Sequence, residues 1–262
     1  MIRIKRPSLA RGPIISTCAV VIVFILWELS GRLGWSNTLL LPPPSEIAAT
    51  AVDLLTHGYG SASLLVHLGV SLARALGAFA CAILLGVPIG LAMGLVPDFH
   101  ALLSPFVQFL RPLPKLALIP LVILWFGIGE FSKFVLIFLS TFLTVAVGSA
   151  AAVVNMRPQR IKAARALGSS SINLFRRVIL PSVLPEIFLS VRLGVGIGWT
   201  TLIAAEMIAS TTGLGWMITN AGSYLRTDIV MLGILILGTT GYALDVALVA
   251  LQKIVAPWAG KE

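Results

Sequence analysis

The sequence has few charged residues and few cysteines. Of its 262 residues, 11% are charged and 58% are hydrophobic. A soluble domain of this length has about a quarter of its residues charged, which it needs to cover its surface, so the composition excludes a soluble protein. The two cysteines, Cys18 and Cys81, lie in separate apolar runs, and their spacing suggests neither a disulfide framework nor a metal site.

The sequence also lacks the motifs of an enzyme. No G-x-x-x-x-G-K-[ST] phosphate loop occurs anywhere in the chain. The three histidines are isolated, and no Ser-His-Asp, paired-carboxylate or metal-ligand arrangement is present. Gly194, Gly196 and Gly198 imitate part of a nucleotide fingerprint, but they lie in an apolar run, where helix packing is the better interpretation. We therefore predict no ATPase site, no catalytic residue, no metal and no cofactor.

Long apolar runs take the place of these features. A membrane-spanning helix needs about 20 residues to cross a hydrocarbon core of ~30 Å. The first run follows a basic tail, as in a signal peptide, but no small-x-small cleavage site follows it, so an uncleaved span is predicted. The sequence predicts an all-α integral membrane protein with six transmembrane helices, near residues 14–29, 71–96, 114–128, 131–154, 183–210 and 229–251.

Glycine and proline predict details of two spans. Gly86, Gly90 and Gly94 are four residues apart, which places them along one stripe of the second span, where a partner helix can approach closely. Pro88 is expected to kink this span. The entry to the third span is expected to be irregular, because three prolines interrupt it: Pro112, Pro114 and Pro120.

The net charge of +9 is unevenly distributed. In a soluble protein such an excess would suggest nucleic acid as a partner, but here it marks topology, since Lys and Arg accumulate in cytoplasmic segments. Four basic residues lie in the N-terminal tail. The segment 155–181, called the basic loop below, has no Asp or Glu and six basic residues: Arg157, Arg160, Lys162, Arg165, Arg176 and Arg177. We therefore expect both termini inside and no nucleic-acid partner.

The sequence of the basic loop predicts a short helix of compact residues. Ser169–Ser171 can cap a second helical turn. Pro181 is expected to stop the helix before the fifth span. Two interpretations follow from the residues alone. The helix can enter a groove on a partner protein, or the loop is solvated and only fixes the topology.

The loop resembles the motif of ABC-importer permeases, Glu-Ala-Ala-x3-Gly-x9-Ile-x-Leu-Pro. The matching residues, with every interval kept, are Ala163, Ala164, Gly168, Leu180 and Pro181. Lys162 replaces the glutamate and Val178 the isoleucine. The lysine puts in doubt any salt bridge that the family glutamate makes, but not the docking helix.

The resemblance extends over nearly the whole chain, from LPPPSEI to the closing Trp. PLPKLALIPLVILWFGIGEFSK looks like the nitrate, sulfonate and taurine permease family, and RLGVGIGWTTLIAAEMIASTTGLGWMITNAGSYLRTDIVMLGI looks closest to the taurine permease branch. The resemblance implies a type I importer (MetI-like) fold with its core in residues 67–250. A cytoplasmic tail (1–13) and a first span with an external segment (14–66) would precede the core, and a cytoplasmic tail (251–262) would follow it.

The resemblance also implies a function and partners. The chain would be the permease subunit of an ATP-driven ABC importer in the bacterial cytoplasmic (inner) membrane. It would form the translocation path for taurine or a related alkanesulfonate by alternating access. Its partners would be two ABC ATPase subunits, a second permease copy in a homodimer, a periplasmic or lipid-anchored substrate-binding protein, and membrane lipid. Contact with the ATPase would involve Lys162, Ala163, Ala164, Arg165, Leu167, Gly168, Leu174, Phe175, Leu180 and Pro181.

Five residues of the fifth span are candidates for the path. Arg192 could meet a sulfonate, since a guanidinium binds such oxygens in two-pronged fashion, or it could snorkel or pair with an acid. For Glu206 three interpretations are open: it has a function in transport, it reaches the outer interface, or it caps a neighbouring turn. The two lie 14 residues apart, about 21 Å along a helix, and cannot pair. Trp199, Thr200 and Thr201 offer a ring face and hydroxyls, either to the path or to packing.

Alternatives to this function remain open. The same machine could carry nitrate or another small organic solute. A self-contained secondary transporter or channel would show transport by this chain alone and an internal repeat of spans, and no convincing repeat is found. A membrane enzyme would need a reactive cluster, and none is apparent.

Overall fold

The computed structural model describes residues 11–259, apart from the side chains of residues 11–14 and 16. Within this range the chain is helical, and its only extended pairing is an isolated bridge between Tyr59 and Ala62. The all-α prediction is confirmed. The chain divides into two compact units, Met1–Leu65 with Met217–Leu235, and Val66–Trp216 with Ile236–Glu262.

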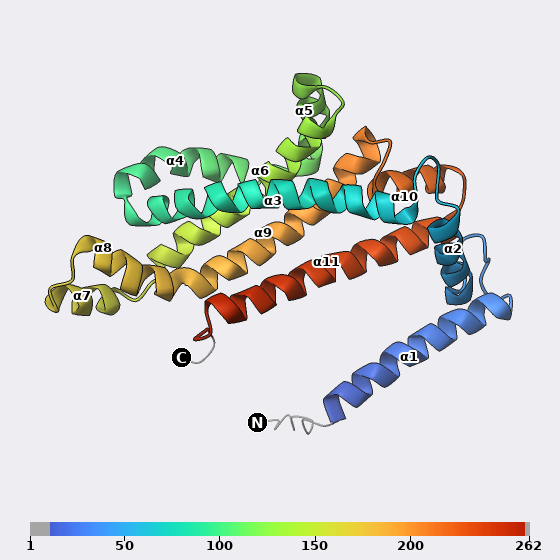
Figure 1. The fold of residues 1–262 in the computed structure, drawn as a ribbon, viewed down its shortest axis with the longest axis horizontal. Coiled ribbons are helices and arrows are strands. Elements are labelled where there is room, and N and C mark those ends of the chain that lie inside the picture. The colour runs from blue at the N-terminus through green and yellow to red at the C-terminus, as the bar shows by residue number, and fades with distance from the viewer. Residues whose placement is uncertain (1–10, 260–262) are drawn as a thin grey trace. The chain divides into compact units, whose positions relative to one another are not determined.

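Among the residues that the structure describes, four helical stretches are long and apolar enough to cross a membrane. Figure 1 shows the course of these helices. They are α3 (Leu64–Leu95), α6 (Glu130–Val154), the continuous stretch Ser171–Ala209 that contains α9 (Leu180–Ala209), and α11 (Thr227–Val255). They confirm the second, fourth, fifth and sixth predicted runs. Their lengths of 25 to 39 residues exceed the minimum for a span.

The third predicted span is bent at its start. Helix α4 (Pro97–Leu110) is followed by the 3₁₀ turn η1 (Lys115–Leu118) and α5 (Ile119–Phe126), and the two halves meet at 88°. The irregular entry is confirmed, since prolines remove the backbone donors that a straight helix would need here. Helix α1 (Arg11–Arg32) covers the first predicted run. The count of six spans stays a prediction, and most of the tail 1–13 lies outside the described residues.

In the first unit, polar contacts join α2 (Pro44–Thr56) to α1 and to the start of α11. The backbone N–H and the hydroxyl of Ser45 donate to the Glu28 carboxylate, at 3.0 and 2.7 Å. The hydroxyl of Thr50 donates to the Asp228 carboxylate at 2.9 Å. These bonds satisfy the carboxylates of Glu28 on α1 and Asp228 on α11.

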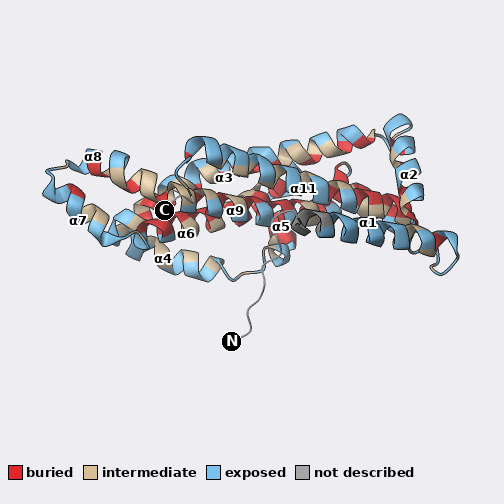
Figure 2. Cartoon of the chain, turned by 90° about the horizontal axis from the view of Figure 1, so that it is seen from below, coloured by how far each residue is buried: buried red, intermediate tan, exposed pale blue. Residues whose placement is uncertain are grey.

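The core of the second unit is the packing of α3, α6 and α9. Residues of α6 and α9 lie side by side in Figure 1 and are among the most buried in Figure 2. The glycine stripe of α3 faces α6: a Cβ on Gly90 would lie 2.7 Å from the Ser149 Cβ, and one on Gly94 would lie 2.6 Å from the Val153 Cβ. Real Cβ atoms do not approach so closely, so the predicted close approach of a partner helix is confirmed.

Glycines also allow close helix packing in α9. A Cβ on Gly194 would lie 2.9 Å from the Val145 Cγ2, and one on Gly198 would lie 2.6 Å from the Phe79 ring. Helix packing, rather than nucleotide binding, therefore explains these two glycines. Gly196 has no atom within 4 Å of such a Cβ and takes no part in this packing.

Candidate functional site

The basic loop consists of two helical pieces joined by a tight turn. Helix α7 (Pro158–Ala166) ends where the backbone N–H of Gly168 donates to the carbonyl of Arg165 at 2.9 Å. Gly168 has a φ of +76°, in the left-handed region that favours glycine after a helix. The next helix, α8 (Ser171–Leu174), is capped by the Ser170 hydroxyl, which accepts from the N–H of Asn173 at 3.4 Å. The predicted capping is confirmed.

The expectation that Pro181 stops the helix is wrong. A π-helical turn, η2 (Phe175–Ile179), joins α8 to α9, and the helix continues without a break from Ser171 to Ala209. In this turn the N–H of Leu180 donates to the carbonyl of Phe175, five residues back. The wider π turn shifts the hydrogen-bond register just before Pro181, which has no N–H to donate. The helix therefore accommodates the proline.

A small apolar cluster holds α7 against η2. Ala164, Leu174 and Ile179 are buried in it, and four partly buried residues pack around them: Met156, Ile161, Phe175 and Val178. Two residues predicted to contact a partner, Ala164 and Leu174, therefore face into the loop's own core. Their packing fixes the distance between the two helical pieces.

The outer face of the loop is exposed, basic and partly apolar. Leu167 is 86% exposed and Ile172 is 69% exposed. Around them, the predicted contact residues Lys162, Ala163, Arg165 and Gly168 are exposed, whereas Phe175, Leu180 and Pro181 are half-buried. Two large apolar side chains are therefore exposed among charged residues on this face of the loop.

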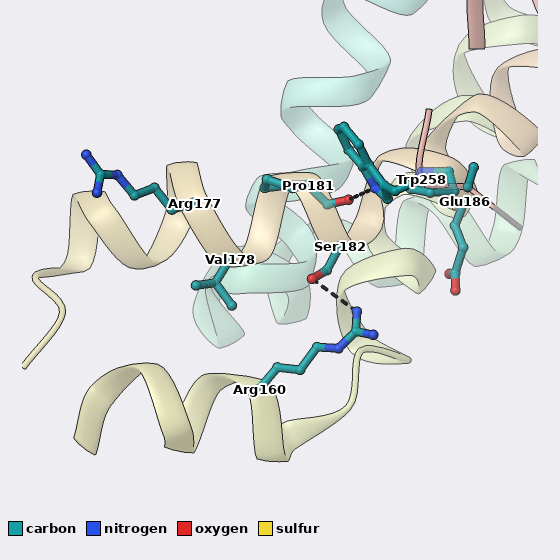
Figure 3. Close-up of a pocket in the computed structure, with 9 residues that line it drawn as sticks. Arg160, Arg177, Val178, Pro181, Ser182, Glu186 and Trp258 are labelled. Atoms are coloured by element: carbon teal, nitrogen blue, oxygen red, sulfur yellow. Dashed lines mark hydrogen bonds between the residues drawn. The ribbon is translucent and has the colours of Figure 1, made fainter. Parts of the chain in front are cut away.

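A pocket of about 660 Å³ lies at the base of the basic loop (Figure 3). Arg160 reaches from α7 and donates from Nη1 to the Ser182 hydroxyl at 3.2 Å. The indole N–H of Trp258 donates to the carbonyl of Pro181 at 3.1 Å. The C-terminal segment is therefore attached to the start of α9, beside the loop.

Glu206 lies in a buried polar network at the end of α9. Its side chain is 0% exposed, and it accepts from the Ser71 hydroxyl at 2.8 and 2.9 Å, from Arg74 Nη1 at 2.7 Å and from the N–H of Gly215 at 3.0 Å. A buried carboxylate is stable only when it is paired and hydrogen-bonded in this way. Glu206 therefore binds protein groups.

Arg74 extends this network to two more elements. Its Nε and Nη2 donate to Glu130 at 2.6 and 2.7 Å, and its Nη1 donates to the carbonyl of Thr212 at 2.8 Å. The network thus joins α3, α6, α9 and the segment before α10 (Leu214–Ser223). Sequence analysis missed Ser71, Arg74 and Glu130, and the available signal was a set of ionisable residues near the ends of three spans.

Arg192 is paired with an acid in the adjacent helix. Its Nε and Nη2 donate to the two carboxylate oxygens of Asp245 on α11, each at 2.8 Å. This is the bidentate geometry expected for a sulfonate, but a carboxylate of the protein occupies it. A pocket of about 240 Å³ lies beside the pair and is also lined by Trp199, whose indole N–H donates to the carbonyl of Leu237 at 3.2 Å.

The structure does not bring all five predicted path residues together. Arg192 and Trp199 share a pocket, and Glu206 belongs to the separate network. The hydroxyls of Thr200 and Thr201 both donate to the carbonyl of Ile197, at 2.8 and 2.9 Å. Their donors are therefore used within α9. Across residues 11–259, no group of three or more His, Cys, Asp and Glu is placed to hold a metal.

Comparisons with known proteins agree with this architecture. The model of the family "Binding-protein-dependent transport system inner membrane component" matches residues 82–261. The chain is 40% identical to the taurine transport system permease protein TauC of Escherichia coli (strain K12), over 98% of this chain and 94% of that protein. It is 37% identical to the putative aliphatic sulfonates transport permease protein SsuC of the same organism, over 90% and 88%.

A solved structure shares the fold. The inward-facing MetNI methionine ABC transporter superposes with a TM-score of 0.55 at 19% identity, over 76% of this chain and 98% of that chain. At this identity the likeness shows the fold alone, and it confirms the predicted MetI-like class.

Proposed function

The chain belongs to the family of binding-protein-dependent transport system inner membrane components, and from this premise we propose its substrate, partners and mechanism. It is the membrane-spanning permease subunit of an ATP-driven ABC importer, in a bacterial inner membrane. Its substrate is taurine or a related alkanesulfonate. The observation that carries the substrate class is the match to a taurine permease over nearly the full length of both chains.

Energy for transport comes from partner subunits. The sequence has no phosphate loop of its own, so ATP binding must act on the permease through contact. The exposed face around Leu167, with its basic neighbours, supports a docking surface for the ATPase. When two ATPase subunits close on ATP, the docked loops move with them and the spans change from inward-open to outward-open.

We propose that two copies of the permease form the path as a homodimer, with two ATPase subunits and an external substrate-binding protein. Both termini lie on the cytoplasmic side, which follows from the six basic residues in the basic loop and the four in the N-terminal tail. Arg192 and Trp199 lie at the wall of the path, where the pair with Asp245 fixes the arginine. Glu206 acts through the network that joins the ends of the spans, and Thr200 and Thr201 contribute helix surface.

Reconstitution with single omissions tests this function. The permease is placed in vesicles with its ATPase and binding protein, and ATP-dependent uptake of labelled taurine is measured with each component left out in turn. Uptake that requires all three components is expected. Uptake by the permease alone would refute the importer mechanism and favour a secondary transporter. ATPase activity without taurine uptake would refute the substrate, and labelled nitrate and other small solutes are then tested in the same vesicles.

A further inference from the structure

A second pocket, of about 280 Å³, lies among α3, α4 and α6, away from the five predicted path residues. It has a largely apolar floor that includes Met93 and Ala150, both buried. Its polar residues come from α4, from the residue that follows α4 and from the residue that follows α6: His100, Ser104, Gln108, Arg111 and Asn155. Small-molecule sites typically combine a mostly apolar concave wall with a few convergent polar groups.

The polar residues of α4 form one stripe of that helix. His100, Ser104 and Gln108 are four residues apart, and Arg111 follows three residues later, so all four share one face. The Gln108 amide donates to the Ser104 hydroxyl at 2.6 Å, which aligns two members of the stripe. All four residues line the pocket, so the stripe faces it.

The opposite face of α4 is apolar. Leu102, Phe106 and Phe109 lie about half a turn away from the stripe, and all three side chains are exposed. Helix α4 therefore presents apolar groups outward and polar groups to the pocket. This arrangement is the reverse of that in a water-soluble helix, because the polar residues are turned toward the cavity and the large apolar residues are exposed.

The charge of the pocket is positive and uncompensated. None of its lining residues is acidic, and Arg111 forms no salt bridge with any residue that the structure describes. Arg192, by contrast, is paired with Asp245 through its Nε and Nη2. Lys115 adds a second cation close by, because its ammonium group donates to the carbonyl of Arg111 at 2.6 Å. The exposed Arg111 guanidinium has the charge and the forked donors that suit an anion with several oxygens.

We propose that this pocket is a binding site for the transported anion inside the permease, and that it takes a short organic sulfonate. The sulfonate oxygens bind Arg111 and Gln108, with Asn155 just after α6, and the carbon chain lies against Met93 and Ala150. The ammonium group of taurine stays in water, because no acidic residue lines the pocket. The proposal rests on the proposed function and deepens it, since it adds a site in this chain to the one on the external binding protein. The phosphate of a lipid headgroup has related chemistry, and the experiment separates the two.

Equilibrium binding to the permease–ATPase complex, without the binding protein, tests the site. The complex is placed in nanodiscs of phosphatidylcholine, and labelled taurine is measured by scintillation proximity, with unlabelled propanesulfonate as a competitor. Replacing Arg111 with Gln is expected to weaken binding by at least about tenfold, because it removes a charge-assisted hydrogen bond. Arg111→Lys keeps the charge but loses the fork, so an intermediate affinity is expected.

Phe109→Leu is the matched control, since it changes the opposite face of the same helix. It is expected to leave the dissociation constant within about twofold of the unsubstituted protein. Assembly of each variant is checked by gel filtration and by ATP hydrolysis. Equal loss of binding in Phe109→Leu and Arg111→Gln would refute the site, because the effect would then come from the helix as a whole.

Addition of phosphatidylglycerol to the nanodiscs separates substrate from lipid. Taurine affinity unchanged by this lipid supports the proposal. Retention of phosphatidylglycerol that depends on Arg111, together with no taurine binding, would overturn it and identify a lipid site. Normal uptake of taurine by the Arg111→Gln complex would overturn the site and leave the importer function intact, whereas absence of any sulfonate uptake by the unsubstituted complex would refute the function itself.

Discussion

Gly168 allows the proposed transmission of force to be tested with the addition of one methyl group. Its φ of +76° lies in the left-handed region, and no atom lies within 4 Å of the position that a Cβ would take. Alanine would therefore introduce backbone strain without a steric clash. The strain of this conformation for a residue with a Cβ is about 1–2 kcal/mol, and asparagine tolerates it better.

The expected effect is on coupling and not on assembly. A bias of about 1–2 kcal/mol changes the ratio of the native turn to alternative turns by roughly five- to thirtyfold. Because this turn sets the position of α7 relative to α8, Gly168→Ala should lower the amount of taurine imported per ATP hydrolysed. Gly168→Asn should lower it less, in the order of the strain.

A second glycine provides the control. Gly34 has a φ of +71°, also has no atom within 4 Å of an added Cβ, and lies outside the basic loop. Gly34→Ala should therefore lose a similar amount of stability and keep normal coupling. Taurine uptake and phosphate release are measured in the same vesicles. Unchanged coupling in Gly168→Ala, or equal uncoupling by Gly34→Ala, would refute the reasoning.

Three further predictions concern packing and charge. Gly90→Ala should destabilise the permease by about 1–3 kcal/mol through overpacking against α6. Gly77 has open space around it, so Gly77→Ala should instead stabilise α3 by about 0.5–1 kcal/mol. Thermal unfolding in detergent measures both variants, and unchanged stability of the Gly90 variant would contradict the packing. Glu206→Gln should cost about 1–3 kcal/mol, seen as a lower melting temperature; an unchanged value would mean that its network adds no stability. Reversing both charges of the Arg192–Asp245 pair should restore uptake lost in either single reversal, with a coupling energy of about 1–3 kcal/mol; no recovery would assign Arg192 a role beyond the pair.

The sequence predicted features that depend on local spacing. The glycine stripe of α3 is one example, because residues four apart lie on one helix face wherever the helix is placed. The bend before α5 is another, since its three prolines are adjacent to it. The capping of α8 by Ser170 likewise needs only residues within one turn.

Contacts between distant residues could not be predicted in this way. Arg74 meets Glu130 and Glu206 across 56 and 132 positions of the sequence, and Arg192 meets Asp245 across 53. Helical periodicity gives each helix a polar side, but it does not state which helix that side faces. This is why three roles stayed open for Arg192, which could meet a sulfonate, snorkel or pair with an unidentified acid, and why Arg74 was missed.

The continuity of the helix through Pro181 matters for the proposed mechanism. Had the proline ended the helix, a flexible joint would separate the basic loop from the fifth span. Instead the π turn keeps the helix continuous over 39 residues, from Ser171 to Ala209, a length of about 58 Å. The same rod carries the start of the loop's second helix, then Arg192, then Glu206 at its far end. We therefore expect a displacement of Ile172, which lies on this helix, to be passed along α9, and the Arg192–Asp245 pair and the Glu206 network are the contacts expected to rearrange when α9 moves.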